Sequence, residues 1–260
     1  MPSPPMSRRQ VAAGLAVAGL AGACASGAAD VAVSDGRLSA RPGPVSAAAS
    51  QRGAFRLDTW PQPDVFIPPG HDVLKPAPLM LLLHGGGGGG DRLLRAFVPL
   101  ASEHGVLLLA PEAERRTWDV VRAFQYGGEP EFGADVKRVD ASLEALFAQA
   151  VVDQRRIAIA GMSDGASYAL SLGLRNAALF SHIIAFSPGG IAPFSGRPKP
   201  RIFISHGRRD RVLAFDNTAS GMVGGLKTAG ADVTFTPFDG DHELRPQEMR
   251  AAMDWWLKAR

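Results

Sequence analysis

The stretch RIAIAGMSDGASYALSLGLRN, residues 156–176, joins an apolar run to a helical pattern through one short turn. The apolar run IAIA is typical of a strand that is covered on both faces of a sheet. The segment after the turn, 167–176, has the composition and spacing of a helix. The turn itself has the pattern G-x-S-x-G, with Ser163 between Gly161 and Gly165. In a strand-turn-helix setting this pattern predicts a sharp bend that exposes the serine hydroxyl at the start of the helix.

The glycines beside Ser163 have a steric reason in such a bend, because larger side chains would meet the helix and the neighbouring strand. The helix dipole also favours negative charge that develops near the serine oxygen. A chain with 30 glycines can contain G-x-S-x-G by chance. The evidence is therefore the strand and the helix on either side of the pattern.

Continuous apolar runs alternate with helical patterns from Phe55 to the end of the chain. This alternation predicts an α/β fold with a doubly wound, mostly parallel sheet of about eight strands and no large lid domain. Only a Pro-Gln-Pro turn separates the first two strands, so we expect them to be antiparallel. The predicted strands are 54–60, 64–68, 79–84, 106–111, 156–161, 182–187, 201–206 and 232–238, and the predicted helices are 91–105, 136–150, 167–176 and 245–259.

Residues 1–24 predict an export signal. Arg8 and Arg9 precede a weakly apolar run that ends at Ala23, which resembles a twin-arginine signal and is too short to span a bilayer. The only cysteine, Cys24, stands where a bacterial lipoprotein would be cleaved and acylated, which would attach the protein to a membrane. Cleavage after the preceding A-x-A triplet and a disordered leader are the alternatives. We expect an exported protein that is periplasmic, secreted or anchored to the envelope.

Residues 25–53 are rich in Ala, Ser, Gly and Pro and lack apolar periodicity, which predicts a disordered linker before a folded domain at 54–260. The net charge of the 260-residue chain is +3. Its Lys and Arg residues are scattered, which disfavours a nucleic-acid partner. A single cysteine cannot form an internal disulfide, and nothing in the sequence indicates the oligomeric state.

Two further polar side chains follow predicted strands and can act on Ser163. Asp210 lies in the loop after the strand at 201–206, and His242 lies in the loop after the strand at 232–238. A serine hydroxyl needs a base, and the base needs a third group that orients it. The chain order Ser163, Asp210, His242 is the one expected for this arrangement on an α/β sheet.

Other candidates for these roles are weaker. Asp239 and Asp241 compete with Asp210 as the acid that orients His242, although they lie close to it in sequence. His206 follows a strand and can orient the Asp210 loop, and His182 begins a strand and is expected to be structural. The remaining histidines outside the glycine run, His71 and His104, are expected at the surface. No Cys/His cluster and no H-E-x-x-H pattern occurs, so the sequence predicts no metal.

The run of six glycines at 85–90 follows a predicted strand and precedes a predicted helix, and two interpretations are open. It satisfies the dinucleotide pattern G-x-G-x-x-G, and Glu112 lies about 20 residues beyond, where a ribose-binding acid would be. Alternatively, His84 and the glycines after it match an HGGG-type loop, whose backbone N–H groups bind an oxyanion.

We favour the oxyanion, because a homopolymer of glycine satisfies the dinucleotide pattern trivially. The expected donors are the N–H groups of Gly86 and Asp164, with Gly85 as a neighbouring possibility. The side chain of His84 is expected to brace this loop. Asp164 places a carboxylate beside Ser163, and we expect its side chain to face away from the oxyanion.

The region 112–135 has no clear period and leaves the carboxyl end of a strand, where open α/β sheets bind ligands. Its aromatic side chains Trp118, Phe124 and Tyr126 are costly to leave in water, so we expect them to line a substrate pocket. The loop of Phe194 is a further candidate, and all four rings can equally belong to the core. A plain surface loop is the alternative for the region as a whole.

From Phe55 to the C-terminus the chain resembles the α/β-hydrolase fold, and within it the small serine esterases of the phospholipase/carboxylesterase and polyhydroxybutyrate-depolymerase-like group. The resemblance rests on the segments DVFIPPG, LLLHGGGG, VVDQRRIAIAGMSDGASYAL, ISHGRRDRVLAFDNTASG and FDGDHELRPQEMRAAMDWWL. Two features depart from the pattern: the glycine run is longer than needed, and Asp164 is charged.

The resemblance implies that residues 54–260 are a catalytic domain with Ser163 as nucleophile, His242 as general base and Asp210 as its orienting acid. It implies hydrolysis of carboxylic esters, with short acyl or aryl groups, through an acyl-enzyme and without a cofactor. The implied partner is a small-molecule ester. A peptidase or thioesterase with the same three residues, and a binding protein without activity, remain alternatives.

Overall fold

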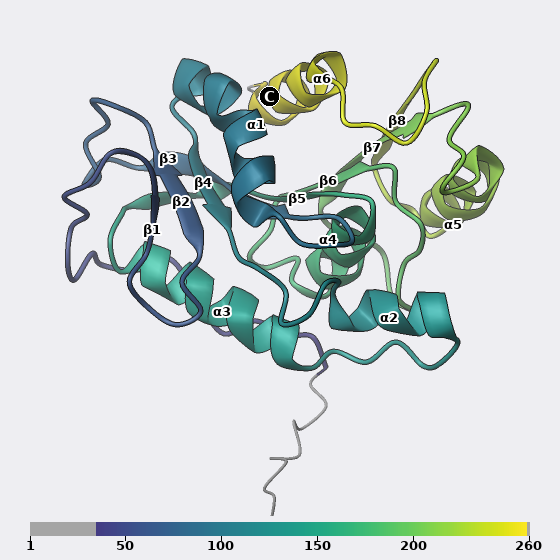
Figure 1. The fold of residues 1–260 in the computed structure, drawn as a ribbon, viewed down its shortest axis with the longest axis horizontal. Coiled ribbons are helices and arrows are strands. Elements are labelled where there is room, and N and C mark those ends of the chain that lie inside the picture. The colour runs from purple at the N-terminus through teal and green to yellow at the C-terminus, as the bar shows by residue number, and fades with distance from the viewer. Residues whose placement is uncertain (1–34, 259–260) are drawn as a thin grey trace, which may run out of the picture. The chain divides into compact units, whose positions relative to one another are not determined.

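The computed structural model describes residues 35–258, which belong to one compact unit. Its centre is an eight-stranded sheet in the order β1-β2-β4-β3-β5-β6-β7-β8 (Figure 1). The first strand pairs, β1 with β2 and β2 with β4, are antiparallel, and all the others are parallel. The predicted α/β class, the strand number and the antiparallel first pair are confirmed. The strands are β1 Gly53–Arg56, β2 Asp64–Ile67, β3 Ala77–Leu83, β4 Leu107–Ala110, β5 Val152–Met162, β6 His182–Phe186, β7 Arg201–Gly207 and β8 Val233–Phe238.

The sheet is buried on both faces, and the two-residue period of its strands separates two apolar cores. In β3, Leu79 and Leu81 point to one core, whereas Met80 and Leu82 point to the other. Helices α1 and α6 contribute to the second core, and α2, α3, α4 and α5 cover the opposite face (Figure 1). The helices are α1 Gly90–His104, α2 Asp119–Tyr126, α3 Ala134–Phe147, α4 Asp164–Arg175, α5 Val223–Thr228 and α6 Pro246–Leu257.

Two helices were not predicted from the sequence. Helix α2 lies in the region 112–135, where only eight residues are helical, too few for an apolar period to stand out. Helix α5 contains two glycines in VGGLKT and continues a π-helical segment at Asn217–Met222. Glycine lowers helix propensity, so this segment lacks a helical signal.

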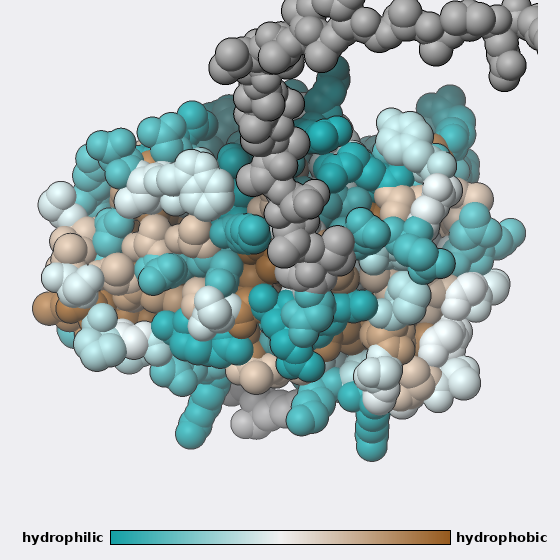
Figure 2. All heavy atoms as spheres, turned by 90° about the horizontal axis from the view of Figure 1, so that it is seen from below, coloured by the Kyte–Doolittle hydropathy of each residue, from teal (hydrophilic) through white to brown (hydrophobic). Residues whose placement is uncertain are grey.

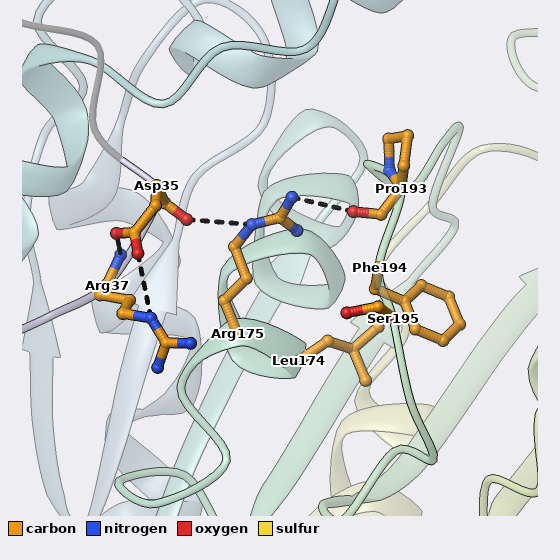
Figure 3. A pocket seen from close by; sticks show the side chains of 7 residues that line it. All are labelled: Asp35, Arg37, Leu174, Arg175, Pro193, Phe194 and Ser195. Atoms are coloured by element: carbon orange, nitrogen blue, oxygen red, sulfur yellow. Dashed lines mark hydrogen bonds and ion pairs between the residues drawn. The ribbon is translucent and has the colours of Figure 1, made fainter.

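The segment 35–52 is not the free linker that its composition predicted. Leu38 is 3% exposed and its N–H donates to the Asn176 side chain at 2.9 Å, while the N–H groups of Ser39 and Ala40 donate to Asp140 at 2.9 and 2.8 Å. Arg175, at the end of α4, donates to the Asp35 carbonyl and to the Pro193 carbonyl (Figure 3). Every second residue is buried from 36 to 40, which is too short a pattern to recognise in an Ala- and Ser-rich sequence.

The predicted export signal and Cys24 lie outside the described residues, as does the first part of the predicted linker. Between residues 35 and 258, no helix combines the length and the apolar character that crossing a bilayer requires. Figure 2 views the molecule from the side on which α2 and α3 lie in Figure 1. Hydrophilic side chains spread over this face, and apolar side chains form small patches between them.

Candidate active site

The turn between β5 and α4 holds Ser163 in a strained conformation, with φ 57° and ψ −119°. Both neighbouring glycines are required by space. A Cβ on Gly165 would overlap the carbonyl oxygens of Leu83 and His84 at the end of β3, and a Cβ on Gly161 would overlap the Gly165 carbonyl. The close approach of α4 to β3 therefore forces the bend that the G-x-S-x-G pattern predicted, and Ser163 remains partly exposed.

The structure brings Ser163, His242 and Asp210 into one hydrogen-bonded chain. The Oγ of Ser163 lies 2.9 Å from His242 Nε2, and His242 Nδ1 lies 2.7 Å from Asp210 Oδ2. A carboxylate only accepts, so Nδ1 carries the proton and Nε2 is free to accept from the serine hydroxyl. This is the geometry in which an imidazole can remove the proton of a hydroxyl.

Asp210 is fixed by the loop that follows β7. Its Oδ1 accepts the N–H groups of Val212 and Leu213 at 2.9 and 2.7 Å, and its side chain has no exposed surface. Burial alone would raise the pKa of Asp210, but the Leu213 N–H, His242 and the Val212 N–H outweigh it and lower the pKa below its ordinary value. The carboxylate therefore stays ionised and available to orient His242.

The competing acids Asp239 and Asp241 do not reach the imidazole. Asp241 Oδ1 instead accepts the backbone N–H groups of Arg211 and His242 at 2.9 and 2.8 Å, and its carboxylate pairs with the Arg211 guanidinium. These contacts, led by the Arg211 N–H, lower the pKa of Asp241 to about 2. Asp239 pairs with Arg209 at the surface. Asp241 thus ties the loop of the acid to the loop of the base.

The loop after β3 places Gly86 beside the nucleophile turn. Gly86 is exposed, and within residues 35–258 its N–H donates to no protein acceptor. Asp164 is the first residue of α4, where a helix leaves its N–H groups without acceptors from the preceding turn. His84 Nδ1 donates to the Gly85 carbonyl at 2.7 Å and its Nε2 accepts the Ala113 N–H at 3.0 Å. His84 braces the loop, as the sequence predicted.

The backbone N–H groups at the end of the glycine run are bound by the side chain of Glu112. Its carboxylate accepts the N–H groups of Gly90 at 2.6 Å and Gly89 at 3.3 Å, and it lies 3.1 Å from His84 Nε2. Burial alone would raise the pKa of Glu112, but His84 in its charged form and the N–H groups of Gly90 and Gly89 lower it to about 2. Because Glu112 itself takes the Gly89 and Gly90 donors and places a carboxylate beside them, this end of the run is not available to a pyrophosphate, which argues against the dinucleotide interpretation.

The Asp164 carboxylate lies over Gly86, where a Cβ would come 2.8 Å from its Oδ2. Thr117 donates to that oxygen at 2.6 Å, and the Gln125 amide donates to both carboxylate oxygens at 3.2 and 3.3 Å. The side chain is therefore held toward α2, and two donors offset its charge. The sequence did not single out Thr117 or Gln125, since no short pattern links them to Ser163.

The three aromatic residues of the region 112–135 that were predicted to line a substrate pocket lie in different environments. Trp118 has no exposed surface and stacks on Tyr168 with ring centroids 4.9 Å apart, so it belongs to the core. Phe124 is partly exposed and lies on Gly190. Tyr126 is 81% exposed and lines a separate cavity on another face of α2, with Arg115 and Glu129. The direction in which each side chain points depends on its position around helix α2, and the sequence did not predict this helix.

Phe194 lies at the opposite end of α4 from Ser163. It borders a cavity of about 500 Å³ with Asp35, Arg37 and Arg175 (Figure 3). Phe194 therefore does not line a pocket at the serine. Among the residues that the structure describes, no group of three or more His, Cys, Asp or Glu side chains is arranged to hold a metal ion.

With this geometry in place, comparison with known proteins identifies the family. The model of the esterase PHB depolymerase family matches residues 63–192, which is half of the 260-residue chain. The chain belongs to this family. No curated protein is significantly similar to it in sequence. Membership in the esterase PHB depolymerase family confirms, at the level of the family, the predicted hydrolase that acts on small-molecule carboxylic esters.

Solved structures share the fold with this member of the family. Esterase PE8 is 23% identical, with a TM-score of 0.56 over 74% of this chain and 95% of its own. The S-formylglutathione hydrolase FrmB from Staphylococcus aureus is 14% identical, with a TM-score of 0.63 over 83% of this chain and 100% of its own. A phospholipase/carboxylesterase from Dyadobacter fermentans is 20% identical, with a TM-score of 0.54 over 84% and 100%. The predicted α/β-hydrolase fold is thereby confirmed.

Proposed function

We propose that this esterase hydrolyses esters with short acyl or aryl groups through an acyl-enzyme on Ser163. The observation that carries the proposal is the continuous hydrogen-bonded chain from Ser163 Oγ through His242 to Asp210, at 2.9 and 2.7 Å. His242 takes the serine proton as Oγ attacks the ester carbonyl, and it then gives that proton to the leaving alcohol. A water molecule activated by His242 releases the acid and restores the enzyme.

The oxyanion of each tetrahedral intermediate is held by the N–H groups of Gly86 and Asp164. Support comes from the exposed Gly86 N–H, which has no protein acceptor among residues 35–258, and from the position of Asp164 at the first turn of α4. The helix dipole adds favourable potential at the same place. The Gly85 carbonyl accepts from His84 Nδ1, so the Gly86 N–H of the same trans peptide points away from His84.

A Ser163→Ala variant tests the nucleophile. We expect hydrolysis of p-nitrophenyl acetate to fall by about 10⁴-fold or more, with little change in melting temperature. The matched control is Ser195→Ala, which changes a serine at the remote cavity and should keep full activity. A fluorophosphonate should label the wild type once and leave the Ser163→Ala variant unlabelled. Ordinary turnover by the Ser163→Ala variant would refute the proposal.

The same three residues also serve peptidases and thioesterases, so the substrate class needs its own test. We expect short p-nitrophenyl esters and aryl esters such as feruloyl esters to be cleaved faster than matched thioesters and anilides. An anilide that is cleaved as fast as its matched ester would assign a peptidase instead.

We also propose that the protein is exported, because paired arginines and an apolar run precede Cys24 in the sequence. The test is the N-terminus of the mature protein isolated from cells. A mature chain that begins with acylated Cys24 supports a lipoprotein, and one that begins unmodified at residue 24 supports secretion. A protein that keeps Arg8 and Arg9 contradicts export.

A further inference from the structure

A second histidine contacts the same carboxylate oxygen as His242. His206, near the end of β7, has no exposed surface, and its Nε2 lies 3.1 Å from Asp210 Oδ2. The same Nε2 lies 2.9 Å from the carbonyl oxygen of Leu213, in the loop of Asp210. One oxygen of Asp210 therefore lies between two imidazoles, and only that of His242 touches the serine.

The contacts of His206 define its protonation. The Leu213 carbonyl can only accept, so Nε2 carries a proton and donates it to that carbonyl, at a position close to Asp210 Oδ2. Nδ1 is buried and has no hydrogen-bond partner among the described residues, and the ring packs edge-on against Phe215. A second proton on Nδ1 would be a buried donor without an acceptor, which is costly. His206 is thus a neutral donor.

We propose that His206 is a positioning residue of the proposed esterase, which acts on His242 through Asp210. Asp210 accepts hydrogen bonds from two backbone N–H groups on Oδ1 and from His242 on Oδ2, and the Nε2–H of His206 adds a favourable dipole beside Oδ2, with Nε2 3.1 Å away. Each donor disperses the negative charge of the carboxylate, so the carboxylate stabilises a charged His242 less strongly. His206 therefore keeps His242 free to act as a base at lower pH. The inference rests on the proposed function.

The other charged groups around this carboxylate are paired or turned outward. From the Asp210 loop, Arg211 pairs with Asp241 and Arg209 with Asp239. From the same loop, Arg208 lies over the ring of Phe215, 5.3 Å from its centroid. From the loop after β8, Asp241 accepts the N–H of His242. None of these pairs involves the Nε2–H of His206.

The test is the pH profile of kcat/KM with p-nitrophenyl acetate for the His206→Leu and His206→Gln variants. Leucine removes the donor, so we expect the acid limb to move to higher pH by roughly 0.5–1 unit. Glutamine has an amide N–H that can reach the same position, so its limb should lie near that of the wild type. The control is Phe215→Leu, which loses a ring contact but keeps the donor and should melt lower without moving the limb.

An unmoved limb in the His206→Leu variant would overturn the proposal, as would equal shifts in the leucine and glutamine variants. If the leucine variant does not fold, ¹⁵N-histidine NMR of the wild type decides. We expect the neutral ring of His206 to carry its proton on Nε2, as its contact with the Leu213 carbonyl requires. A neutral ring protonated on Nδ1 instead would overturn the proposal. This spectrum does not depend on turnover, so a failure of the Ser163→Ala test stays distinguishable from a failure here.

Discussion

Two glycine-rich turns meet at Ser163, and they need glycine for different reasons. At Gly161 and Gly165 the backbone is ordinary, but a Cβ would overlap neighbouring backbone atoms. In the run at 85–90, Gly87 has φ 98°, yet the nearest atom to an added Cβ is 4.0 Å away. Space fixes glycine at 161 and 165, and the sign of φ fixes it at 87–89 in the run. The two turns are both rich in glycine, but they should tolerate substitution of these glycines to different degrees.

The Gly165→Ala substitution should have the largest effect. The new Cβ would overlap the carbonyls of Leu83 and His84, so α4 must move away from β3. We expect a loss of about 3 kcal/mol or more in unfolding free energy, or no soluble protein. Chemical denaturation measures it, with Gly224→Ala in α5 as the control, because a Cβ added there meets no atom within 4 Å. Similar stability of the two variants would contradict the steric explanation.

The Gly87→Ala substitution should destabilise the protein less than Gly165→Ala does, and it should lower activity. At this positive φ, alanine lowers the unfolding free energy by about 1–2 kcal/mol relative to glycine. Relaxation of the loop would also displace the neighbouring Gly86 N–H. We expect kcat for p-nitrophenyl acetate to fall by about tenfold or more, because that N–H matters most in the transition state. An unchanged kcat would show that Gly86 is not a donor to the oxyanion.

Because of Glu112, the stability of the protein should depend on pH in the acidic range. Its pKa is lowered from 4.5 to about 2, so its stabilisation is complete above pH 4.5 and is lost as the pH falls toward 2. Glu112→Gln should lower stability near neutral pH by less than Gly87→Ala does, since the carboxylate is partly exposed. Denaturation at several pH values measures both proteins. A gap between them that stays constant from pH 6 to about pH 2 would contradict this assignment.

The Gly85→Ala substitution should have the smallest effect. Its φ is not positive, and an added Cβ would make ordinary contacts with Met162 O at 3.4 Å and Ser163 Cβ at 3.5 Å. We expect a change within about 1 kcal/mol and a modest change in turnover. Melting temperature and kcat/KM measure it. A loss as large as that of Gly165→Ala would show that the whole run is under steric constraint.

Local sequence patterns predicted most of the sheet and the hydrogen-bonded series Ser163–His242–Asp210. Buried parallel strands are continuous apolar runs, and the loops after them reach one edge of the sheet, so Asp210 and His242 could be placed without coordinates. The division of roles between Asp210 and Asp241 was also favoured in advance. What sequence could not show was that Asp241 joins the two loops through backbone N–H groups.

The errors of prediction concern segments whose structure depends on distant partners. Trp118 was expected at a pocket, but its ring is stacked on Tyr168 in α4. The segment 35–52 has the composition of a linker, and most of its hydrogen-bonded N–H groups find their acceptors at least 100 residues away along the chain, on Asp140, Asn176 and the carbonyls of Ala148 and Gln149. Such contacts leave no local period, so single-sequence patterns miss them.

That segment has a practical consequence for where a shortened version of the enzyme can begin. A chain cut at Gly53, where the first strand starts, would uncover the surface now covered by Leu38 and Ala49. It would also leave the buried side chain of Asn176 without the Gly36 carbonyl and the Leu38 amide. A recombinant catalytic unit should therefore start no later than Asp35, eighteen residues before the first strand.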